Sequence, residues 1–280
     1  MNDVTICFSD TLTAIMGVNG AGKTTVIHAL ACVYQPDDGG KGENHKFPEF
    51  FVPNTDSLWR GSELHVVNEK EGKNGQRVVL PSRRYGKDFD RWSPRYENRP
   101  KRNVYYIGID TCLPEIEKST ATSRIKYSSQ KKTGRLADNI IRDSAYILNK
   151  PYQELLDNTY QNKHFSGVAL SSGLKYSSLS MGTGEQRVLK ILEKVRSAEA
   201  YSLILIDEID LLLHISALDR LIEVLHDIAQ SRHLQIVFTT HSVEMLKLSR
   251  YVRVQYIANV DPGDKTFVYE KIGGDLLYSL

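Results

Sequence analysis

The sequence of 280 residues predicts an α/β fold in which a sheet of buried strands is flanked by helices. Residues 12–16, 203–206 and 234–240 are largely apolar runs that are typical of buried strands. A helical pattern at residues 26–33 follows the first of these runs. An amphipathic helical pattern follows the second run, with Leu218, Leu221, Ile222 and Leu225 on one face. Strands that alternate with helices favour a largely parallel sheet.

Composition favours an ordinary cytoplasmic protein. Apolar residues make up 41% of the chain, and no run of eighteen apolar residues predicts a membrane span. The first residues lack the basic start and apolar stretch of a secretory signal. The three cysteines, Cys7, Cys32 and Cys112, lie far apart in sequence, which favours reduced thiols over disulfides or a metal site. We therefore expect no contact with a membrane.

Residues 17–25 read G-V-N-G-A-G-K-T-T and match the phosphate-binding pattern G-x-x-x-x-G-K-[ST]. A predicted strand precedes them and a predicted helix follows, as the pattern requires. We expect the backbone amides of this loop and the helix N-terminus to face phosphate oxygens. Lys23 is predicted to reach the β- and γ-phosphates, and Thr24 to hold Mg²⁺. The predicted nucleotide contacts are Gly17, Asn19, Gly20, Ala21, Gly22, Lys23, Thr24 and Thr25.

Two later strands end in polar side chains suited to the same chemistry. Asp207 and Glu208 directly follow the apolar run 203–206, which resembles a Walker B motif. Asp207 is predicted to hold Mg²⁺, and Glu208 to orient and deprotonate the attacking water. His241 ends the strand over residues 234–240, where it could sense the γ-phosphate. The predicted catalytic residues are therefore Lys23, Glu208 and His241.

Residues 179–187 read L-S-M-G-T-G-E-Q-R and precede a predicted helix. This segment resembles the signature of ABC-type ATPases, and its position between the phosphate loop and the Asp-Glu strand identifies the chain as a member of that superfamily. The resemblance implies two nucleotide-binding domains paired head to tail, with Ser180 and Gly182 contacting ATP held by the other subunit. A second register is open, in which Thr183, Gly184 and Glu185 face the phosphate.

The segment after Asp207 and Glu208 indicates a branch of the superfamily. Ile209 stands where transporter subunits usually have proline, and residues 208–214 are similar to the E-x-x-x-L-H type of the overcoming-lysogenization-defect (OLD), RecF-like and Rad50-like ATPases. By this resemblance Asp210 and His214 lie at the dimer seam. No glutamine after the phosphate loop convincingly matches the Q-loop residue of the family.

The resemblance implies a function. It implies an Mg²⁺-dependent ATPase that forms a homodimer or higher oligomer and acts in anti-phage defence or DNA processing. Such a protein senses a trigger and controls a separate effector, such as a nuclease or toxin on another polypeptide. One alternative is an ATP-dependent binding switch with negligible turnover that restrains the partner. Another is a transporter subunit, which Ile209 disfavours.

We expect a single ATPase domain over residues 1–280, with residues 62–165 inserted in it as a β-hairpin and helical arm. The hairpin is predicted from strands at residues 62–69 and 76–80 around the glycine-containing turn 72–75. The arm is predicted from helices at residues 136–148 and 152–160, the second beginning after Pro151. Residues 4–8 read as an edge strand, and residues 251–260 and 265–272 as a closing hairpin around the turn 261–264.

One stretch is a candidate nucleic-acid contact. Residues 83–102, which begin at Arg83 and end at Arg102, carry eight Lys or Arg against three acids, interleaved with four aromatic residues. Cations suit phosphates and rings suit base stacking, so DNA is one candidate partner. A solvated loop with its rings packed on the domain is an equally good interpretation. Residues 124–135 hold five basic residues and no acid, for which a surface loop is expected.

Overall fold

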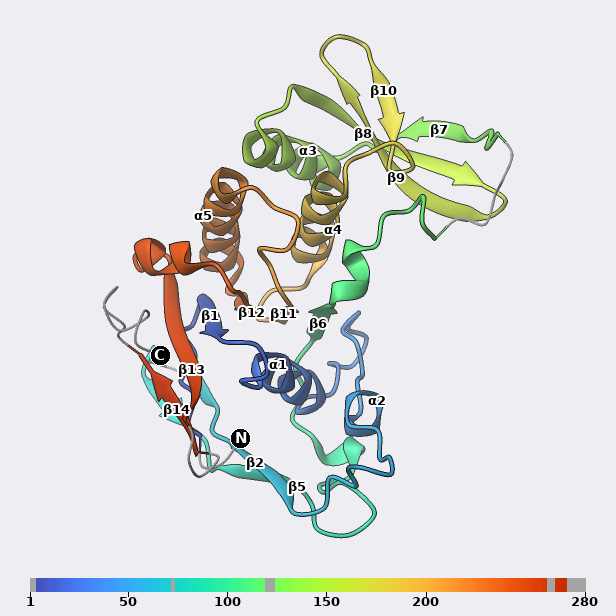
Figure 1. Ribbon diagram of the computed structural model, residues 1–280. Coiled ribbons are helices and arrows are strands. Elements are labelled where there is room, and N and C mark those ends of the chain that lie inside the picture. Colours follow the sequence, from blue (N-terminus) through green and yellow to red (C-terminus); the bar gives the residue numbers. More distant parts are fainter. Residues whose placement is uncertain (1–3, 72–73, 119–123, 261–264, 271–280) are drawn as a thin grey trace. The chain divides into compact units, whose positions relative to one another are not determined.

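The computed structural model describes residues 4–71, 74–118, 124–260 and 265–270 (Figure 1). The chain divides into two compact units. The first consists of residues 1–27 and 105–280, and the second of residues 28–104. We describe each unit by itself.

The first unit contains a six-stranded sheet with the strand order β14-β13-β1-β12-β11-β6. Its strands are β1 (Leu12–Gly17), β6 (Val104–Ile107), β11 (Leu203–Ile206), β12 (Gln235–Thr239), β13 (Val252–Val260) and β14 (Lys265–Tyr269). β12 is parallel to both β1 and β11, and β13 is parallel to β1. Only β14 is shown to run antiparallel to its neighbour among the strand pairs described for this sheet. The predicted α/β fold with a largely parallel sheet is therefore confirmed.

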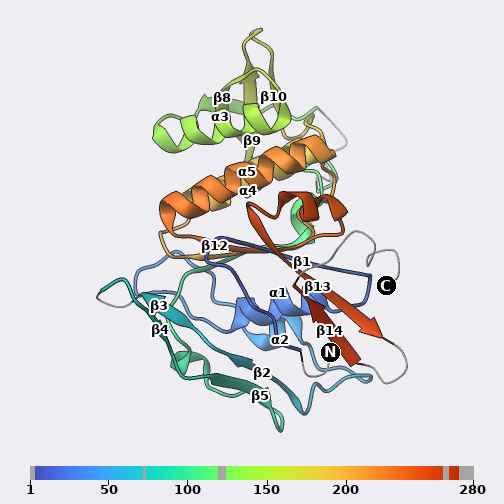
Figure 2. The ribbon, with the colours of Figure 1, turned by 90° about the vertical axis from the view of Figure 1, so that its left-hand side faces the viewer.

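Helices cover one face of this sheet in layers. Figure 2 shows α4 (Thr183–Ser197) and α5 (Ile215–Arg232) over the sheet, with α3 (Arg135–Leu148) beyond them. The four predicted apolar positions of α5 are all buried: Leu218, Leu221, Ile222 and Leu225. α1 (Lys23–Cys32) begins at the end of the phosphate loop, as predicted. Residues of α3, α4 and α5 and of β1, β6, β11, β12 and β13 belong to one apolar core.

An antiparallel sheet takes the place of the second predicted arm helix. Its strands, in the order β10-β9-β8-β7, are β7 (Ser128–Lys131), β8 (Tyr152–Tyr160), β9 (Lys163–Leu170) and β10 (Lys175–Ser177). The helix predicted over residues 152–160 was wrong. Gln161 and Asn162, with φ of 46° and 63°, form the tight turn that folds β9 back onto β8. Cross-strand burial of Leu155 against Val168 then overrides a weak helical preference.

The second unit contains α2 (Phe47–Phe50), the 3₁₀ turn η1 (Tyr96–Asn98) and two short antiparallel pairs. β2 (Ser62–Val66) pairs with β5 (Arg83–Lys87), and β3 (Glu69–Glu71) pairs with β4 (Arg77–Val79). The predicted hairpin partners are confirmed only for β3 and β4. The first predicted strand splits because Leu64 lies opposite Tyr85 of β5, which is almost fully buried. Residues 72–73 of the predicted turn lie outside the described residues.

Three further expectations concern the ends of the chain. Residues 4–8 form no strand, because β1 already pairs with β12 on one side and β13 on the other. The closing hairpin is confirmed by β13 and β14, although the turn 261–264 and residues 271–272 lie outside the described residues. Among the described residues, no helix combines the length and apolarity needed to cross a bilayer. The remaining 3₁₀ segments are η2 (Ile109–Cys112) and η3 (Val243–Leu248).

Candidate nucleotide site

The phosphate loop connects β1 to α1 within the first unit. Gly17 ends β1 with φ of 149°, and a Cβ at this position would lie 2.2 Å from the carbonyl oxygen of Ile257 on β13. Gly20 and Gly22 have φ of 79° and 94°, which glycine adopts without steric cost. The loop therefore has its tight course because the sequence places glycine where a side chain would clash or strain the backbone.

Lys23 is the most buried polar group of the loop. Its side chain is 6% exposed, and Nζ donates to the carbonyl oxygens of Gly17 at 2.9 Å and Val18 at 3.0 Å. Burial lowers the pKa of Lys23, while Glu208 and Asp207 oppose that shift. The ammonium thus lies inside the curve of the loop, where positive charge suits phosphate.

Asp207 joins three elements of the site. Its Oδ1 accepts from the Thr24 hydroxyl of α1 at 3.1 Å and from the Thr239 hydroxyl of β12 at 2.6 Å. Its backbone amide donates to the carbonyl of Ile107 at the end of β6. The side chain is 1% exposed and every one of these partners is polar, as a buried carboxylate requires. An oxygen atom of Thr24 and one of Asp207 therefore lie close together beside the phosphate loop. Oxygen atoms are the ligands that Mg²⁺ prefers.

Glu208 and His241 follow neighbouring strands, β11 and β12. Glu208 has φ of 50°, and its amide donates to the Thr239 hydroxyl at 2.7 Å. The carboxylate lies 4.0 Å from Nε2 of His241, and both side chains are partly exposed. The His241 amide is 3.3 Å from the Asp210 carboxylate. The structure thus brings together the predicted residues Lys23, Thr24, Asp207, Glu208 and His241 at the carboxyl ends of β1, β11 and β12.

Comparison with known sequences identifies the family of the chain. A sequence profile of the AAA_21 family, described as "AAA domain, putative AbiEii toxin, Type IV TA system", matches residues 57–247. The chain belongs to this family. The match begins after the phosphate loop and contains the Asp-Glu strand and His241. No curated protein matches the chain.

Solved structures show that this AAA_21 member has the fold of an SMC head domain. The SMC head domain from Thermotoga maritima is similar with a TM-score of 0.55 and 16% identity, covering 96% of this chain and 93% of that one. An SMC head bound to the C-terminal winged-helix domain of ScpA is similar with a TM-score of 0.51 and 15% identity, covering 98% and 94%. At such low identity the likeness shows the fold alone. The predicted fold class is confirmed.

In the signature segment of this AAA_21 protein, residues 179–187, some residues are exposed and others pack against the rest of the chain. Ser180 and Gly182 are exposed, and Gly182 precedes the first residue of α4. Gly184 instead packs on the chain itself, since a Cβ there would lie 2.5 Å from the carbonyl oxygen of Leu212. Glu185 is buried and contacts the Lys150 ammonium.

Sequence analysis missed Arg187, a buried side chain on α4. Its Nη2 donates to the carbonyl oxygens of Asp207 at 2.7 Å and Glu208 at 2.9 Å. Its Nη1 donates to the Thr111 hydroxyl and to Sγ of Cys112, both in η2. Burial lowers the pKa of Arg187, and the nearby Cys112 and Asp207 oppose the shift. The only sequence signal was its place directly after the signature, on a helix that should face the core.

Residues 83–102, the candidate nucleic-acid contact, lie in the second unit and make mainly internal contacts. Trp92 stacks on Phe47 with ring centroids 4.3 Å apart, and the Tyr85 hydroxyl donates to the Val33 carbonyl. Arg99 is buried and donates to several oxygens of residues 32–45. Phe89, by contrast, is 81% exposed. Of the four aromatic residues, Phe89 is therefore the one that presents most of its ring for stacking.

Proposed function

We propose that this chain is an Mg²⁺-dependent ATPase that works as a head-to-tail dimer and controls a separate effector protein. The observation that carries the proposal is the position of Asp207, whose Oδ1 contacts Thr24 of the phosphate loop and Thr239 of β12. This contact joins the phosphate loop, the Asp-Glu strand and the strand that ends at His241. The three parts are those that phosphoryl transfer to water requires.

The residues present fit both ATP and its metal. The amides of residues 20–25 and the Lys23 ammonium would bind phosphate oxygens, while Thr24 and Asp207 would hold Mg²⁺, which neutralises charge on the phosphates. Glu208 is 30% exposed on its side chain, so water can reach the carboxylate that would accept the proton. His241 is near enough to Glu208 to orient it and to respond to the γ-phosphate.

The surface around this site supports a second copy of the chain as the dimer partner. Val18, Leu212, Ile215 and Val243 are each 44–55% exposed. Val18 and Leu212 lie on loops that follow β1 and β11, Ile215 is the first residue of α5, and Val243 is the first residue of η3. Ser180 and Gly182 are exposed as well, whereas Gly184 and Glu185 are held within the chain. We therefore assign Ser180 and Gly182 to the γ-phosphate of ATP held by the partner, which is the first of the two open registers.

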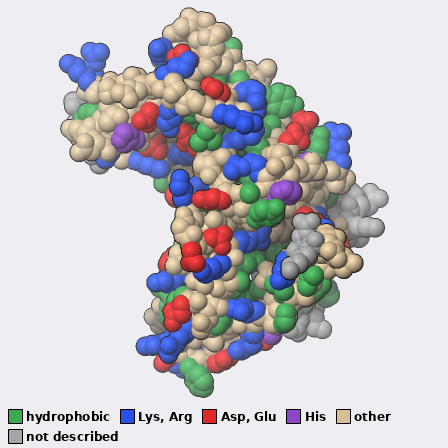
Figure 3. All heavy atoms as spheres, turned by 180° about the vertical axis from the view of Figure 1, so that it is seen from behind, with side chains coloured by type: hydrophobic (Ala, Val, Ile, Leu, Met, Phe, Trp, Pro, Cys, Tyr) green, Lys and Arg blue, Asp and Glu red, His purple; other side chains and the backbone are tan. Residues whose placement is uncertain are grey.

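The proposal of an effector rests on family membership. The description of the family names a putative toxin of a type IV toxin–antitoxin system, and such a system contains a second protein, the antitoxin. Direct contact with DNA has less support. Tyr85, Trp92 and Tyr96 pack within the second unit, and Lys and Arg side chains are interspersed with Asp and Glu on the face shown in Figure 3. DNA contact would then depend on Phe89 and the exposed arginines around it.

Steady-state ATP hydrolysis of the wild-type protein and of Glu208→Gln tests the proposal. We expect turnover that needs Mg²⁺ and falls by about 10² to 10⁴-fold in Glu208→Gln, since a positioned general base contributes roughly that much. Lys23→Ala should abolish ATP binding, and Glu208→Gln should retain ATP and accumulate as a dimer. Equal turnover in Glu208→Gln would refute the assignment of the base.

The same assay separates the remaining candidates. Duplex DNA added at two salt concentrations should leave turnover unchanged if a protein partner controls the enzyme, whereas salt-sensitive stimulation would indicate a DNA contact. ATP binding without turnover above that of Glu208→Gln would indicate the nucleotide-dependent binding switch.

A further inference from the structure

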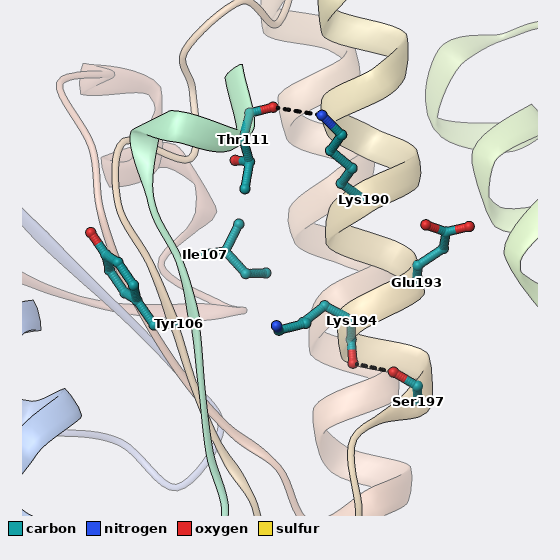
Figure 4. A pocket seen from close by; sticks show the side chains of 7 residues that line it. All are labelled: Tyr106, Ile107, Thr111, Lys190, Glu193, Lys194 and Ser197. Atoms are coloured by element: carbon teal, nitrogen blue, oxygen red, sulfur yellow. Dashed lines mark hydrogen bonds between the residues drawn. The ribbon is translucent and has the colours of Figure 1, made fainter. Parts of the chain in front are cut away.

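One pocket of the first unit is lined by residues other than those of the nucleotide site. It has a volume of about 320 Å³ and lies between α4 and the segment that runs from β6 into η2 (Figure 4). Its lining residues are Tyr106, Ile107, Thr111, Lys190, Glu193, Lys194 and Ser197. All of them belong to the first unit, and neither the phosphate loop nor Glu208 contributes to the lining.

The pocket is basic. Lys190 and Lys194 are one helical turn apart on α4, and Figure 4 shows the Lys194 side chain directed toward Ile107. Glu193 points away from them. It contacts the Lys132 ammonium at 3.3 Å and accepts from the hydroxyl of Ser166, which lies in β9 of the antiparallel sheet β10-β9-β8-β7. The carboxylate of Glu115, which Lys190 contacts at 3.2 Å, is shared with Lys118. The carboxylates beside the two pocket lysines are thus also engaged by other lysines.

Hydrogen bonds connect this pocket to the backbone of the catalytic acids. Lys190 donates to the carbonyl oxygen of Thr111 at 3.3 Å, as the dashed line in Figure 4 marks. The Thr111 hydroxyl accepts from Arg187, and the same guanidinium donates to the carbonyl oxygens of Asp207 and Glu208. A ligand that displaces Lys190 from Thr111 would therefore alter the hydrogen-bonded support of Glu208.

We propose that this pocket binds a carboxylate side chain from an acidic segment of the partner protein and that binding changes ATP turnover through Thr111 and Arg187. An acidic group in the pocket would pair with Lys190 and Lys194. Ile109, Leu113 and Ile116 are 44–51% exposed and belong to η2 and the residues just after it. Apolar side chains beside a basic pocket match a protein segment better than a nucleic-acid backbone, which offers no apolar surface to cover them.

This inference rests on the proposed ATPase and names the surface through which a partner would regulate it. It also limits the kind of partner. The docking segment should carry Asp or Glu next to apolar residues, because the two lysines and the exposed apolar residues lie on adjoining segments. A longer interface around this pocket would supply most of the affinity, so an isolated peptide should bind weakly.

Binding of three labelled probes to the full chain tests the proposal: a peptide of alternating Glu and Leu, the same peptide with Gln for Glu, and a duplex DNA of matched charge. Fluorescence anisotropy should show binding of the Glu peptide, at least about tenfold weaker binding of the Gln peptide, and a similar loss for the Glu peptide with Lys190→Glu/Lys194→Glu. The matched control is Lys163→Glu/Lys175→Glu, which changes two exposed lysines in β9 and β10 and should bind the Glu peptide normally.

Thr111→Val separates binding from its effect. This variant loses the hydroxyl that Arg187 contacts but keeps both lysines, so the Glu peptide should bind with unchanged Kd and no longer alter turnover. Equal binding of the Glu peptide to the wild type and the Lys190→Glu/Lys194→Glu variant would overturn the pocket assignment, as would absence of binding. Preferential binding of duplex DNA that depends on the same lysines would overturn the choice of a protein partner. Failure of the proposed ATPase has a different signature, namely no turnover in a protein that still binds the peptide.

Discussion

Arg187 Nη2 donates to the carbonyl oxygen of Glu208 at 2.9 Å, so the helix after the signature segment holds the backbone of the proposed general base. The same nitrogen reaches the Asp207 carbonyl at 2.7 Å, and the other arm of the guanidinium reaches η2. Arg187 therefore connects α4, the Asp-Glu strand and the loop after β6 through one buried side chain. We regard it as a positioning residue, because it touches the backbone of the acids and not their carboxylates.

Replacing Arg187 should reduce both stability and turnover. Arg187→Met removes the side-chain donor to the Asp207 and Glu208 carbonyl oxygens, of which the second still accepts from the Leu211 amide, and we expect the free energy of unfolding to fall by about 2 to 4 kcal/mol. Arg187→Lys keeps the charge but lacks the planar fork that reaches both sides, so kcat should fall while KM for ATP changes little. Urea unfolding and steady-state kinetics measure the two effects. Arg135→Met, at an exposed position of α3, is the matched control and should change neither. Normal kcat in Arg187→Lys would show that its role is packing alone.

Thr24 should determine how strongly the protein requires Mg²⁺. Its hydroxyl lies 3.1 Å from Asp207 Oδ1, where both oxygens could bind one ion. Thr24→Val removes this ligand while keeping the shape of the side chain, so we expect the Mg²⁺ concentration for half-maximal turnover to rise by about tenfold or more. Thr24→Ser retains the hydroxyl and should need nearly the wild-type concentration. A titration of turnover with Mg²⁺ at saturating ATP distinguishes the two variants, and equal requirements would remove Thr24 from the metal site.

His45 should make the local stability of the second unit depend on pH. Its ring nitrogens lie 3.0 Å from Glu43 and 3.1 Å from Glu49. The hydrogen bond to Glu43 raises the pKa of His45 above 6.5, burial opposes this, and Glu49 raises it further. Because the folded-state pKa is the higher one, the stabilisation is complete below about 6.5 and is lost as pH rises through the folded-state pKa.

Hydrogen exchange of residues 43–51 measures this effect. Protection factors, corrected for the intrinsic rate, should decrease between about pH 6 and pH 8.5 in the wild type, the range in which histidine loses its proton. His45→Gln should show lower protection at the acidic end and little change with pH. A wild-type profile that stays flat would mean that the two contacts with glutamate add no stability.

The sequence predicted the site best where a motif of fixed residue types and spacing has a single known structural role. The glycines and Lys23 of the phosphate loop, and Asp207 and Glu208 after an apolar run, could be assigned to one site before any coordinates because parallel strands end at the same edge of a sheet. Four buried leucine and isoleucine positions likewise predicted the face of α5 that packs in the core.

Other features depend on contacts that sequence spacing does not encode. Residues 152–160 fold as β8 because β9 pairs with them across the Gln161–Asn162 turn, and that pairing was not visible in local propensity. Arg187 resembled any charged residue on a helix until the structure placed its guanidinium beside the carbonyls of Asp207 and Glu208. The pocket at Lys190 and Lys194 arises only when η2 packs on α4.

Two glycines of the signature segment should respond differently to the same substitution. A Cβ on Gly184 would lie 2.5 Å from the Leu212 carbonyl oxygen, so Gly184→Ala should destabilise the monomer by about 1 to 3 kcal/mol, the usual range for overpacking. A Cβ on Gly182 meets nothing closer than 4.0 Å, so Gly182→Ala should leave monomer stability nearly unchanged. If Gly182 faces ATP held by the partner, that added methyl group should instead weaken the ATP-dependent dimer of Glu208→Gln. Urea unfolding without nucleotide measures monomer stability, and light scattering with ATP measures the dimer. If the dimer forms with Gly182→Ala but not with Gly184→Ala, and the two monomers are equally stable, the result would favour the second register, in which Gly184 faces the phosphate.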